Sequence, residues 1–474
     1  MSMTSFILFA LVAVVFGLIY FCNRFFENKS IICTQWILLL SSYLFVIYAD
    51  FRFALVLFAV SLSTWFFAKQ EKWTFMGILL PLLALSYFKY TNFFIESFAN
   101  IFNFDCRTLD IILPIGMSFF TFSAISYVVD VQKGKVASRN FRDVSLYLAF
   151  FPKLVSGPIQ RSGDFFEQMD QKREIGWISF SSGVQIFVFG LFKKIVLADR
   201  LSVFVNQVYD TPNAFGSATV LLAVFAYSLQ IYLDFSGYSD MAIGIAKILG
   251  FNLPRNFNLP YLSHNVTELW KRWHISLSSW LLDYLYISLG GNRKGKIRTY
   301  INLIVTMLLG GLWHGANWTY VIWGLLHGCA LAVHKAWMTV TGSPNKKPNS
   351  VVTAFSIVLT FAFTSFCWIF FRADSVTDAL IIIKRIGSFE TGLEQPYMWF
   401  FIAIVFVLVA SCCAYISSKR RKLVAIKANM SAIEGFYPIL DLSRFWHLVL
   451  FFVEIGLILC WAYTGGSPFI YGQY

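Results

Sequence analysis

Residues 351–371 read VVTAFSIVLTFAFTSFCWIFF, a run of apolar and small side chains without a charged group. A helix needs about 20 mostly apolar residues to cross the hydrocarbon core of a bilayer, and this run has that length. Because lipid offers no hydrogen-bond partner to the backbone, such a run must be helical. The stretch therefore predicts a transmembrane helix.

Similar runs recur along the chain, at residues 6–22, 31–49, 53–68, 178–197, 219–233, 318–337, 398–416 and 445–463. Of the 474 residues, 58% are hydrophobic and 13% are charged, whereas soluble domains carry about 25% charged residues. Shorter apolar pieces of about 12 residues lie between the runs and suit re-entrant or half-spanning helices. These features predict an all-α, polytopic integral membrane protein.

The polar interruptions are each shorter than a domain, and no internal repeat is visible, which favours one membrane domain over residues 1–474. The first run has no basic segment before it, so we expect it to be retained rather than cleaved as a signal peptide. The net charge of +13 comes from basic residues in short loops, which the positive-inside rule explains, and we expect no nucleic-acid binding. The cysteines lack metal-ligand spacing, so no metal site is expected.

Basic loops orient the C-terminal half of the chain. Lysines and arginines are dense at residues 293–298, 346–347 and 419–427, and the positive-inside rule places such loops in the cytoplasm. The last run, residues 445–463, then crosses outward. We therefore expect residues 465–474 on the extracytoplasmic side.

Polar residues and helix breakers gather in four clusters beside the apolar runs. The clusters occupy residues 114–130, 151–161, 232–280 and 310–327. Ionisable and strongly polar residues are unfavourable inside a membrane, so where they occur they mark a pathway or a site by default. The chemistry of the chain is therefore expected in these clusters.

His314 is the most informative residue of the fourth cluster. The apolar piece before it, residues 301–312, follows a basic loop and rises only about 18 Å as a helix, which leaves His314 inside a hydrocarbon core about 30 Å thick. The flanking Gly311 and Gly315 release the helix and let another group approach closely. A desolvated imidazole stays neutral and can act as a general base towards a hydroxyl; the alternative is a hydrogen bond to a neighbouring helix.

The other histidines and the acidic residues carry weaker signals. His274 follows Lys271, Arg272 and Trp273 at the start of an amphipathic piece, where it is either functional or a membrane-interface anchor. His327 is interpreted as a polar residue that joins helices by a hydrogen bond. Asp234 and Asp240 lack the spacing of a hydrolytic carboxylate pair and are interpreted as caps or hydrogen-bond partners. Interface or solvated positions are expected for His264, His334 and His447.

The clusters contain the strings PIGMSFFTFSAISYVVDV, FFPKLVSGPIQR, YLDFSGYSDMAIGIAKILGFNLPRNFN, LWKRWHISLSSWL and GGLWHGANWTYVIWGLLHG. In this order they resemble successive motifs of the membrane-bound O-acyltransferase family, in the bacterial branch that decorates extracytoplasmic polysaccharides. The resemblance covers nearly the whole chain. It implies a bowl of tilted and re-entrant helices that encloses a tunnel from the cytosol to the exterior.

The resemblance also implies roles for individual residues. His314 matches the family's essential histidine, and His274 matches its second motif histidine. Further candidates for lining the tunnel or binding substrate are Trp273, Asp234, Trp313, Asn317 and Lys153. Candidates for attracting the phosphates of a donor from the cytosol are Lys271, Arg272, Arg293 and Lys294.

The tail Pro468-Phe469-Ile470-Tyr471-Gly472-Gln473-Tyr474 resembles the C-terminal Phe-Ile-Tyr motif of the acetyl-transferring members. Related D-alanylation systems supply a similar tyrosine from a separate small membrane peptide. Tyr471 holds the motif position, but Gly472 and Tyr474 depart from the aromatic residues expected there, so Tyr471 or Tyr474 is the reactive tyrosine. The alternative is an aromatic anchor at the membrane interface.

Together these features predict an O-acetyltransferase of the bacterial inner membrane. The resemblance implies acetyl-CoA as a cytosolic donor without a bound cofactor, transfer at His314, and Tyr471 as a first acceptor. It further implies an extracytoplasmic partner, an SGNH or esterase-like acetyltransferase, which passes the acetyl group to a polysaccharide such as peptidoglycan or alginate. The alternatives are D-alanyl transfer to teichoic acids and a polytopic transporter, which would more often show two repeated halves.

Overall fold

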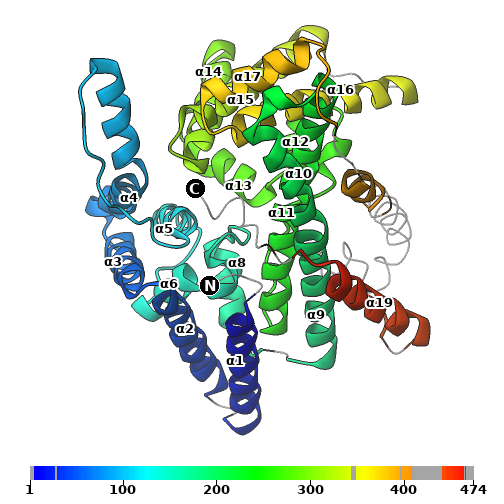
Figure 1. Cartoon of the computed structure of the whole chain (residues 1–474). Helices are drawn as coiled ribbons and strands as arrows, with labels where there is room; N and C mark the ends of the chain where they lie inside the picture. Colours follow the sequence, from blue (N-terminus) through cyan, green and yellow to red (C-terminus); the bar gives the residue numbers. More distant parts are fainter. Residues whose placement is uncertain are drawn as a thin grey trace. The chain divides into compact units, whose positions relative to one another are not determined.

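The structure is a computed structural model that describes residues 5–26, 29–173, 175–342, 349–394, 398–406, 409, 440–442, 444–463 and 465. Every named element within these residues is a helix (Figure 1). The helices long and apolar enough to cross a membrane number seven among the described residues: Ile7–Phe25, Ser30–Ala49, Phe51–Ala68, Glu71–Phe102, Trp177–Asp210, Ser217–Ile248 and Ser350–Arg372. The predicted all-α class is confirmed.

The chain groups into two compact units, and each is described by itself. The first comprises Met1–Phe187 with Tyr238–Pro254, and the second comprises Val188–Gly237 with Arg255–Tyr474. Two helices, α9 (Trp177–Leu191) and α11 (Ser217–Ile248), run from one unit into the other. The single domain over residues 1–474 stays a prediction.

The first unit is built around α5. Its elements are α1 (Phe6–Phe25), α2 (Ser30–Ala49), α3 (Phe51–Ala68), η1 (Glu71–Trp73), α4 (Thr74–Phe102), α5 (Met117–Gln132), α6 (Phe141–Ala149), α7 (Phe151–Leu154) and α8 (Ser162–Met169). Helix α5 packs against α3, α4, α6 and α8. It begins after Gly116, which has a left-handed φ of 72° and lies so close to α7 that a Cβ would meet the Leu154 carbonyl oxygen at 2.3 Å. Only glycine allows α7 to lie against the start of α5 in this way.

The second unit holds the histidine motifs. Its elements are η2 (Phe192–Ala198), α10 (Asp199–Asp210), η3 (Pro212–Ala214), η4 (Pro260–Leu262), α12 (Val266–Arg272), α13 (Ile275–Trp280), η5 (Leu281–Tyr286), α14 (Lys296–His314), α15 (Trp318–Thr341), α16 (Ser350–Arg372), α17 (Val376–Gly387) and α19 (Phe445–Trp461). Helix α15 packs against α12, α14 and α16 (Figure 1). These contacts bring motifs that are distant in sequence into one core.

Most predicted apolar runs correspond to observed helices, with three differences. The spanning helix Glu71–Phe102 was not predicted, because Pro81, Lys89 and Glu96 interrupt its apolar residues. The runs at 318–337 and 445–463 form α15 and α19, which are helical but are not among the seven. Most of the run at 398–416 lies outside the described residues.

Helix α14 is longer than the apolar piece that predicted it. It spans 19 residues and begins at Lys296, within the basic loop, so its first turns are polar. Gly310 and Gly311 lie inside the helix, which ends at His314 with Gly315 as its C-cap. The expectation that the flanking glycines release the helix is therefore correct for Gly315, where the helix ends, and wrong for Gly311, because the helix continues through it.

Candidate active site

His314 closes α14 in a setting made of aromatic rings. Its side chain is buried, with 4% of the residue exposed. Its ring centroid lies 5.0 Å from that of Trp313, 5.1 Å from that of Trp323 and 5.2 Å from that of Phe371. These neighbours come from α14, α15 and α16, so three helices fix the position of the imidazole.

Glycines allow α15 to approach the end of α14. A Cβ at Gly311 would lie 2.2 Å from the Tyr320 carbonyl oxygen, and a Cβ at Gly315 would lie 2.2 Å from the Tyr320 ring. The Tyr320 ring in turn lies 5.0 Å from that of Phe371. Gly311 and Gly315 thus make room for Tyr320, and the approach of another group to the His314 imidazole stays a prediction.

His274 lies between α12 and α13 and is completely buried. Its backbone is left-handed, with φ of 42°, a region that non-glycine residues seldom adopt, although histidine is enriched there. Asn256 holds the turn: its carbonyl oxygen accepts from the Ile275 amide at 2.9 Å, and its Oδ1 accepts from the Ser276 hydroxyl at 2.6 Å. Burial lowers the pKa of His274 to about 3, so the imidazole is neutral near pH 7. The complete burial argues against a role as an interface anchor.

One tryptophan ring lies next to both histidines. The ring of Trp313 is 6.2 Å from that of His274 and 5.0 Å from that of His314. The ring centroid of His274 also lies 4.6 Å from that of Phe235, and the two rings are nearly perpendicular. The structure therefore brings the third and fourth sequence clusters together, and two buried imidazoles next to a common indole form a site suited to proton transfer from a hydroxyl.

Asp234 belongs to a buried ion cluster rather than to the ring site itself. Lys194 Nζ lies 2.6 Å from Asp234 Oδ1 and 2.8 Å from Asp199 Oδ1. The expected role of Asp234 as a bonding partner is confirmed. Lys194 is in the π-helical segment η2, and such segments are often found at functional sites. Because Phe235 follows Asp234 and contacts His274, the ion cluster fixes one wall of the site.

Two further candidates in this unit have structural contacts. The ring centroid of Trp273 lies 5.1 Å from that of Phe257. Trp273 directly precedes His274 in the chain. Asn317 caps α15, since its side-chain oxygen accepts from the Thr319 amide at 3.0 Å and its Nδ2 donates to the Asp374 carbonyl at 2.8 Å. Contact of either residue with substrate stays a prediction.

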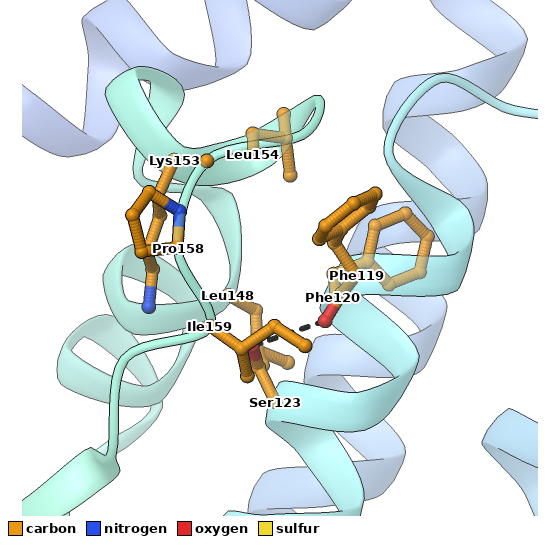
Figure 2. A pocket seen from close by; sticks show the side chains of 9 residues that line it. Phe119, Phe120, Ser123, Leu148, Lys153, Leu154, Pro158 and Ile159 are labelled. Carbon is orange, nitrogen blue, oxygen red and sulfur yellow. Dashed lines mark hydrogen bonds between the residues drawn. The ribbon is translucent and has the colours of Figure 1, made fainter. Parts of the chain in front are cut away.

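Lys153 lies in the first unit, where it is buried with 4% of the residue exposed. Its Nζ is 3.9 Å from the centre of the Tyr147 ring, and burial lowers the pKa of Lys153 well below its ordinary value. A pocket with about 210 Å³ of empty space, part of it open to the outside, adjoins Lys153 and is lined by Phe119, Phe120, Ser123, Leu148, Leu154, Gly157, Pro158 and Ile159. Figure 2 shows the amine behind Pro158, turned away from Phe119 and Phe120. The tunnel-lining role of Lys153 stays a prediction.

Sequence reasoning missed several residues of the site. Trp323 and Phe371 are aromatic residues inside apolar runs, and nothing in their spacing separates them from ordinary core residues. Asn256 and Lys194 carried a usable signal in the sequence, because Asn256 is a polar residue within a motif and Lys194 is a charged residue within an apolar run. Tyr471, Tyr474 and the basic loop at 419–427 lie outside the described residues.

Comparison with known proteins agrees with this geometry. The MBOAT, membrane-bound O-acyltransferase family matches residues 38–372, which include both histidines, Trp323 and Phe371. A probable alginate O-acetylase AlgI from Pseudomonas aeruginosa is 38% identical over 400 residues, which cover 81% of this chain and 74% of that protein. A peptidoglycan O-acetyltransferase from Helicobacter pylori is 38% identical over 344 residues, which cover 67% of this chain and 65% of that protein.

A more distant relative has a different printed activity. A teichoic acid D-alanyltransferase from Bacillus subtilis is 29% identical over 265 residues, which cover 53% of this chain and 67% of that protein. The extent of the family match, the helices able to span a membrane and the buried histidine motifs lead to one conclusion. The chain is a multi-pass membrane enzyme, an acyltransferase that belongs to the membrane-bound O-acyltransferase family.

Proposed function

We propose that this enzyme is an O-acetyltransferase of the bacterial inner membrane. It takes an acetyl group from acetyl-CoA on the cytosolic side and delivers it for O-acetylation of an extracytoplasmic polysaccharide such as peptidoglycan or alginate. The observation that carries the proposal is that the buried His274 and His314 both lie next to the Trp313 ring. The printed activities of the relatives that are 38% identical support acetyl as the group transferred.

The reaction needs a base for the acceptor hydroxyl. In the proposed step the imidazole of His314 takes the hydroxyl proton while the oxygen attacks the thioester carbonyl carbon. The carbon–sulfur bond breaks, the thiolate leaves, and the proton on His314 neutralises it. A carbon–oxygen bond has replaced the carbon–sulfur bond, and no other reactant is required.

The first acceptor in this proposal is the phenol of Tyr471. A phenol with an ordinary pKa of about 10 must be deprotonated as it attacks, which gives the base a specific task. An extracytoplasmic SGNH or esterase-like partner then carries the acetyl group from Tyr471 to the polysaccharide. The sequence of the tail supports this route, because it places a tyrosine at the motif position.

The competing transfer is that of D-alanine to teichoic acid. It is supported by the relatives named for that activity, which are 29% identical over about half of this chain. It is disfavoured by the tyrosine in the tail of this chain, because the D-alanylation systems take theirs from a separate peptide. The two activities differ in donor, so a donor assay separates them.

The test uses the purified enzyme in lipid nanodiscs with radiolabelled acetyl-CoA. We expect ester-linked label on the protein, and His314→Ala should lower the rate of its formation by roughly a hundredfold or more, the usual contribution of a general base. His264→Ala is the matched control, since that histidine is exposed and pairs with Glu268. Transfer from a D-alanyl carrier protein but not from acetyl-CoA would contradict the proposal.

A further inference from the structure

His327 does not form the hydrogen bond that its interpretation as a helix-joining residue requires. It lies in α15 and is completely buried. Within the described part of the chain, neither Nδ1 nor Nε2 of its ring has a hydrogen-bond partner. Its ring instead lies 5.2 Å from that of Trp270 and 5.0 Å from that of Trp323.

The two tryptophans share this property. Their rings are 5.7 Å apart, and the Nε1 of each is buried without an acceptor among the described residues. Three rings in mutual contact thus hold four nitrogens without hydrogen bonds. Native proteins seldom leave even single buried polar groups unsatisfied, and such groups point to a bound water, ion or ligand that completes them.

The cluster lies next to the candidate base. The Trp323 ring is 5.1 Å from that of His314 and 5.0 Å from that of His327, so it is a neighbour of both histidines. Glycines fix this arrangement: a Cβ at Gly324 would lie 2.4 Å from the Met307 carbonyl oxygen, and one at Gly328 would lie 2.8 Å from Ile304 Cα. The backbones of α14 and α15 are therefore in contact here. This contact fixes the position of Trp323 and His327 relative to α14.

The donors and acceptors of the cluster restrict what completes it. Each indole supplies one N–H donor, and a neutral imidazole supplies one donor and one acceptor. The cluster therefore offers three hydrogen-bond donors and one acceptor, and none of the three side chains carries a full charge. The best match is an uncharged oxygen that mainly accepts, which describes a carbonyl. A sugar hydroxyl fits less well, because it brings a donor with its acceptor sites.

We propose that Trp270, Trp323 and His327 form a subsite that binds a carbonyl oxygen of the acyl donor. The oxygen is that of the thioester or that of an amide in the arm that carries it. This inference rests on the proposed acyl transfer at His314 and adds the residues that hold the donor. Its consequence is that these three residues determine donor affinity more than the rate of the chemical step.

Phenylalanine variants test the subsite, because they keep an aromatic ring and remove only the polar nitrogens. Trp270→Phe, Trp323→Phe and His327→Phe are assayed in nanodiscs with acetyl-CoA as the varied donor. We expect the KM for acetyl-CoA to rise about three- to tenfold for each lost hydrogen bond, with a smaller change in kcat. Equilibrium binding of acetyl-CoA reports the same loss of affinity where turnover is too slow to measure.

Free CoA, which keeps the amides and lacks the thioester carbonyl, separates the two sources of the oxygen. If its inhibition constant rises as much as the KM for acetyl-CoA, the subsite binds an amide oxygen. If the KM for acetyl-CoA rises and the inhibition constant of free CoA does not, the subsite binds the thioester oxygen. Either result supports the subsite.

Trp368→Phe is the matched control. The Trp368 ring stacks on that of Trp323 at 5.7 Å, but its Nε1 already donates to the Tyr261 hydroxyl at 3.2 Å. Loss of the Trp368 indole N–H should leave the KM for acetyl-CoA unchanged.

Two results would overturn the inference. An unchanged KM and binding constant in the folded variants would mean that water or neighbouring ring faces satisfy the nitrogens. A lower kcat with unchanged affinity would make Trp323 a positioning residue for His314. If His327→Phe does not fold, the two tryptophan variants decide. A wild-type enzyme that binds acetyl-CoA without transferring acetyl would refute the proposed function alone.

Discussion

At the scale of single residues, the two histidines of the site are held by different constraints. His314 is fixed by rings from three helices, whereas His274 is fixed by its own backbone, which is left-handed with φ of 42°. Non-glycine residues in sparsely populated backbone regions tend to cluster at functional sites. The unusual backbone therefore adds a second reason, besides the motif, to expect a function for His274.

Substitutions at His274 should separate the ring from the backbone. His274→Ala removes the ring and leaves a residue that disfavours φ of 42°, while His274→Gly removes the ring and relieves the backbone. We expect both variants to lose most acetyl transfer, and His274→Gly to be the better folded. Rates in nanodiscs measure acetyl transfer, and size-exclusion profiles measure how well each variant folds. If His274→Gly transfers acetyl like the wild type, the ring has no function.

Loss of the central cation of the ion cluster should destabilise the second unit. Lys194→Met leaves Asp199 and Asp234 buried beside each other without their shared cation, and breaking a buried pair costs about 3–5 kcal/mol. We expect a much lower yield of folded protein and a lower thermal midpoint, which Lys194→Arg should largely restore. The control is Arg444→Met, which removes an exposed pair with Asp441. Wild-type stability in Lys194→Met would show that the pair does not stabilise the fold.

At the scale of elements, the contact between α14 and α15 positions His314. Gly311 is the position where the two backbones come closest to the site, because a Cβ there would lie 2.2 Å from the Tyr320 carbonyl oxygen. A backbone oxygen cannot move aside as a flexible side chain can. The separation of the two helices is therefore set by glycine at this position.

Gly311→Ala should force α14 and α15 apart. Overpacking of this kind costs about 1–3 kcal/mol, and it displaces His314 from Trp323, so we expect lower stability and a larger loss of acetyl transfer. Gly387→Ala is the control, since a Cβ at Gly387 meets nothing within 4 Å at the end of α17. Thermal unfolding and transfer rates of the two variants are compared. Equal behaviour would show that the helix contact does not set the site.

The sequence predicted helices best where apolar residues are continuous. The spans at 31–49 and 351–371 match α2 and α16 closely. Helix α4 was missed because Pro81 and Lys89 break its pattern, although the helix continues through both. Apolar length predicts a helix without showing where a helix with polar turns begins or ends, and α14 illustrates this limit.

The site was predictable only where a polar residue lies in an apolar setting. That signal identified His314, and the motifs identified His274 and Trp313. Asp234 was recognised as a bonding partner, but its cation Lys194 was not, because pairing between distant helices leaves no mark in the spacing. Trp323 was missed for a similar reason, since its contacts to His314 and His327 depend on how α15 packs on α14.

At the scale of the whole molecule, the proposed reaction requires transfer of the acetyl group across the membrane. The basic residues at 419–427 and the final run predict an extracytoplasmic tail. The eight residues from Tyr463 to Tyr471 reach up to about 26 Å when extended, enough to fold back towards a tunnel mouth. Orientation and reach together make Tyr471 the expected acceptor on the outer side.

Tyr471→Phe separates a covalent relay from an aromatic anchor, because it removes only the hydroxyl. We expect glycan acetylation to be lost while the amount of membrane protein stays normal. Tyr474→Phe is the control and should stay active. Acetyl ester in the polysaccharide measures the outcome. Full activity of Tyr471→Phe, alone and combined with Tyr474→Phe, would leave the tail as an anchor.

In the proposed reaction this chain transfers acetyl for an extracytoplasmic polysaccharide with His314 as the base. The most direct measurement is mass spectrometry of ester-linked acetate in envelope and secreted polysaccharides from cells that lack the protein, produce the wild type or produce His314→Ala. We expect acetate esters with the wild type only, at equal membrane levels of the two proteins. Equal acetylation with His314→Ala, or none with the wild type, would contradict the proposed reaction.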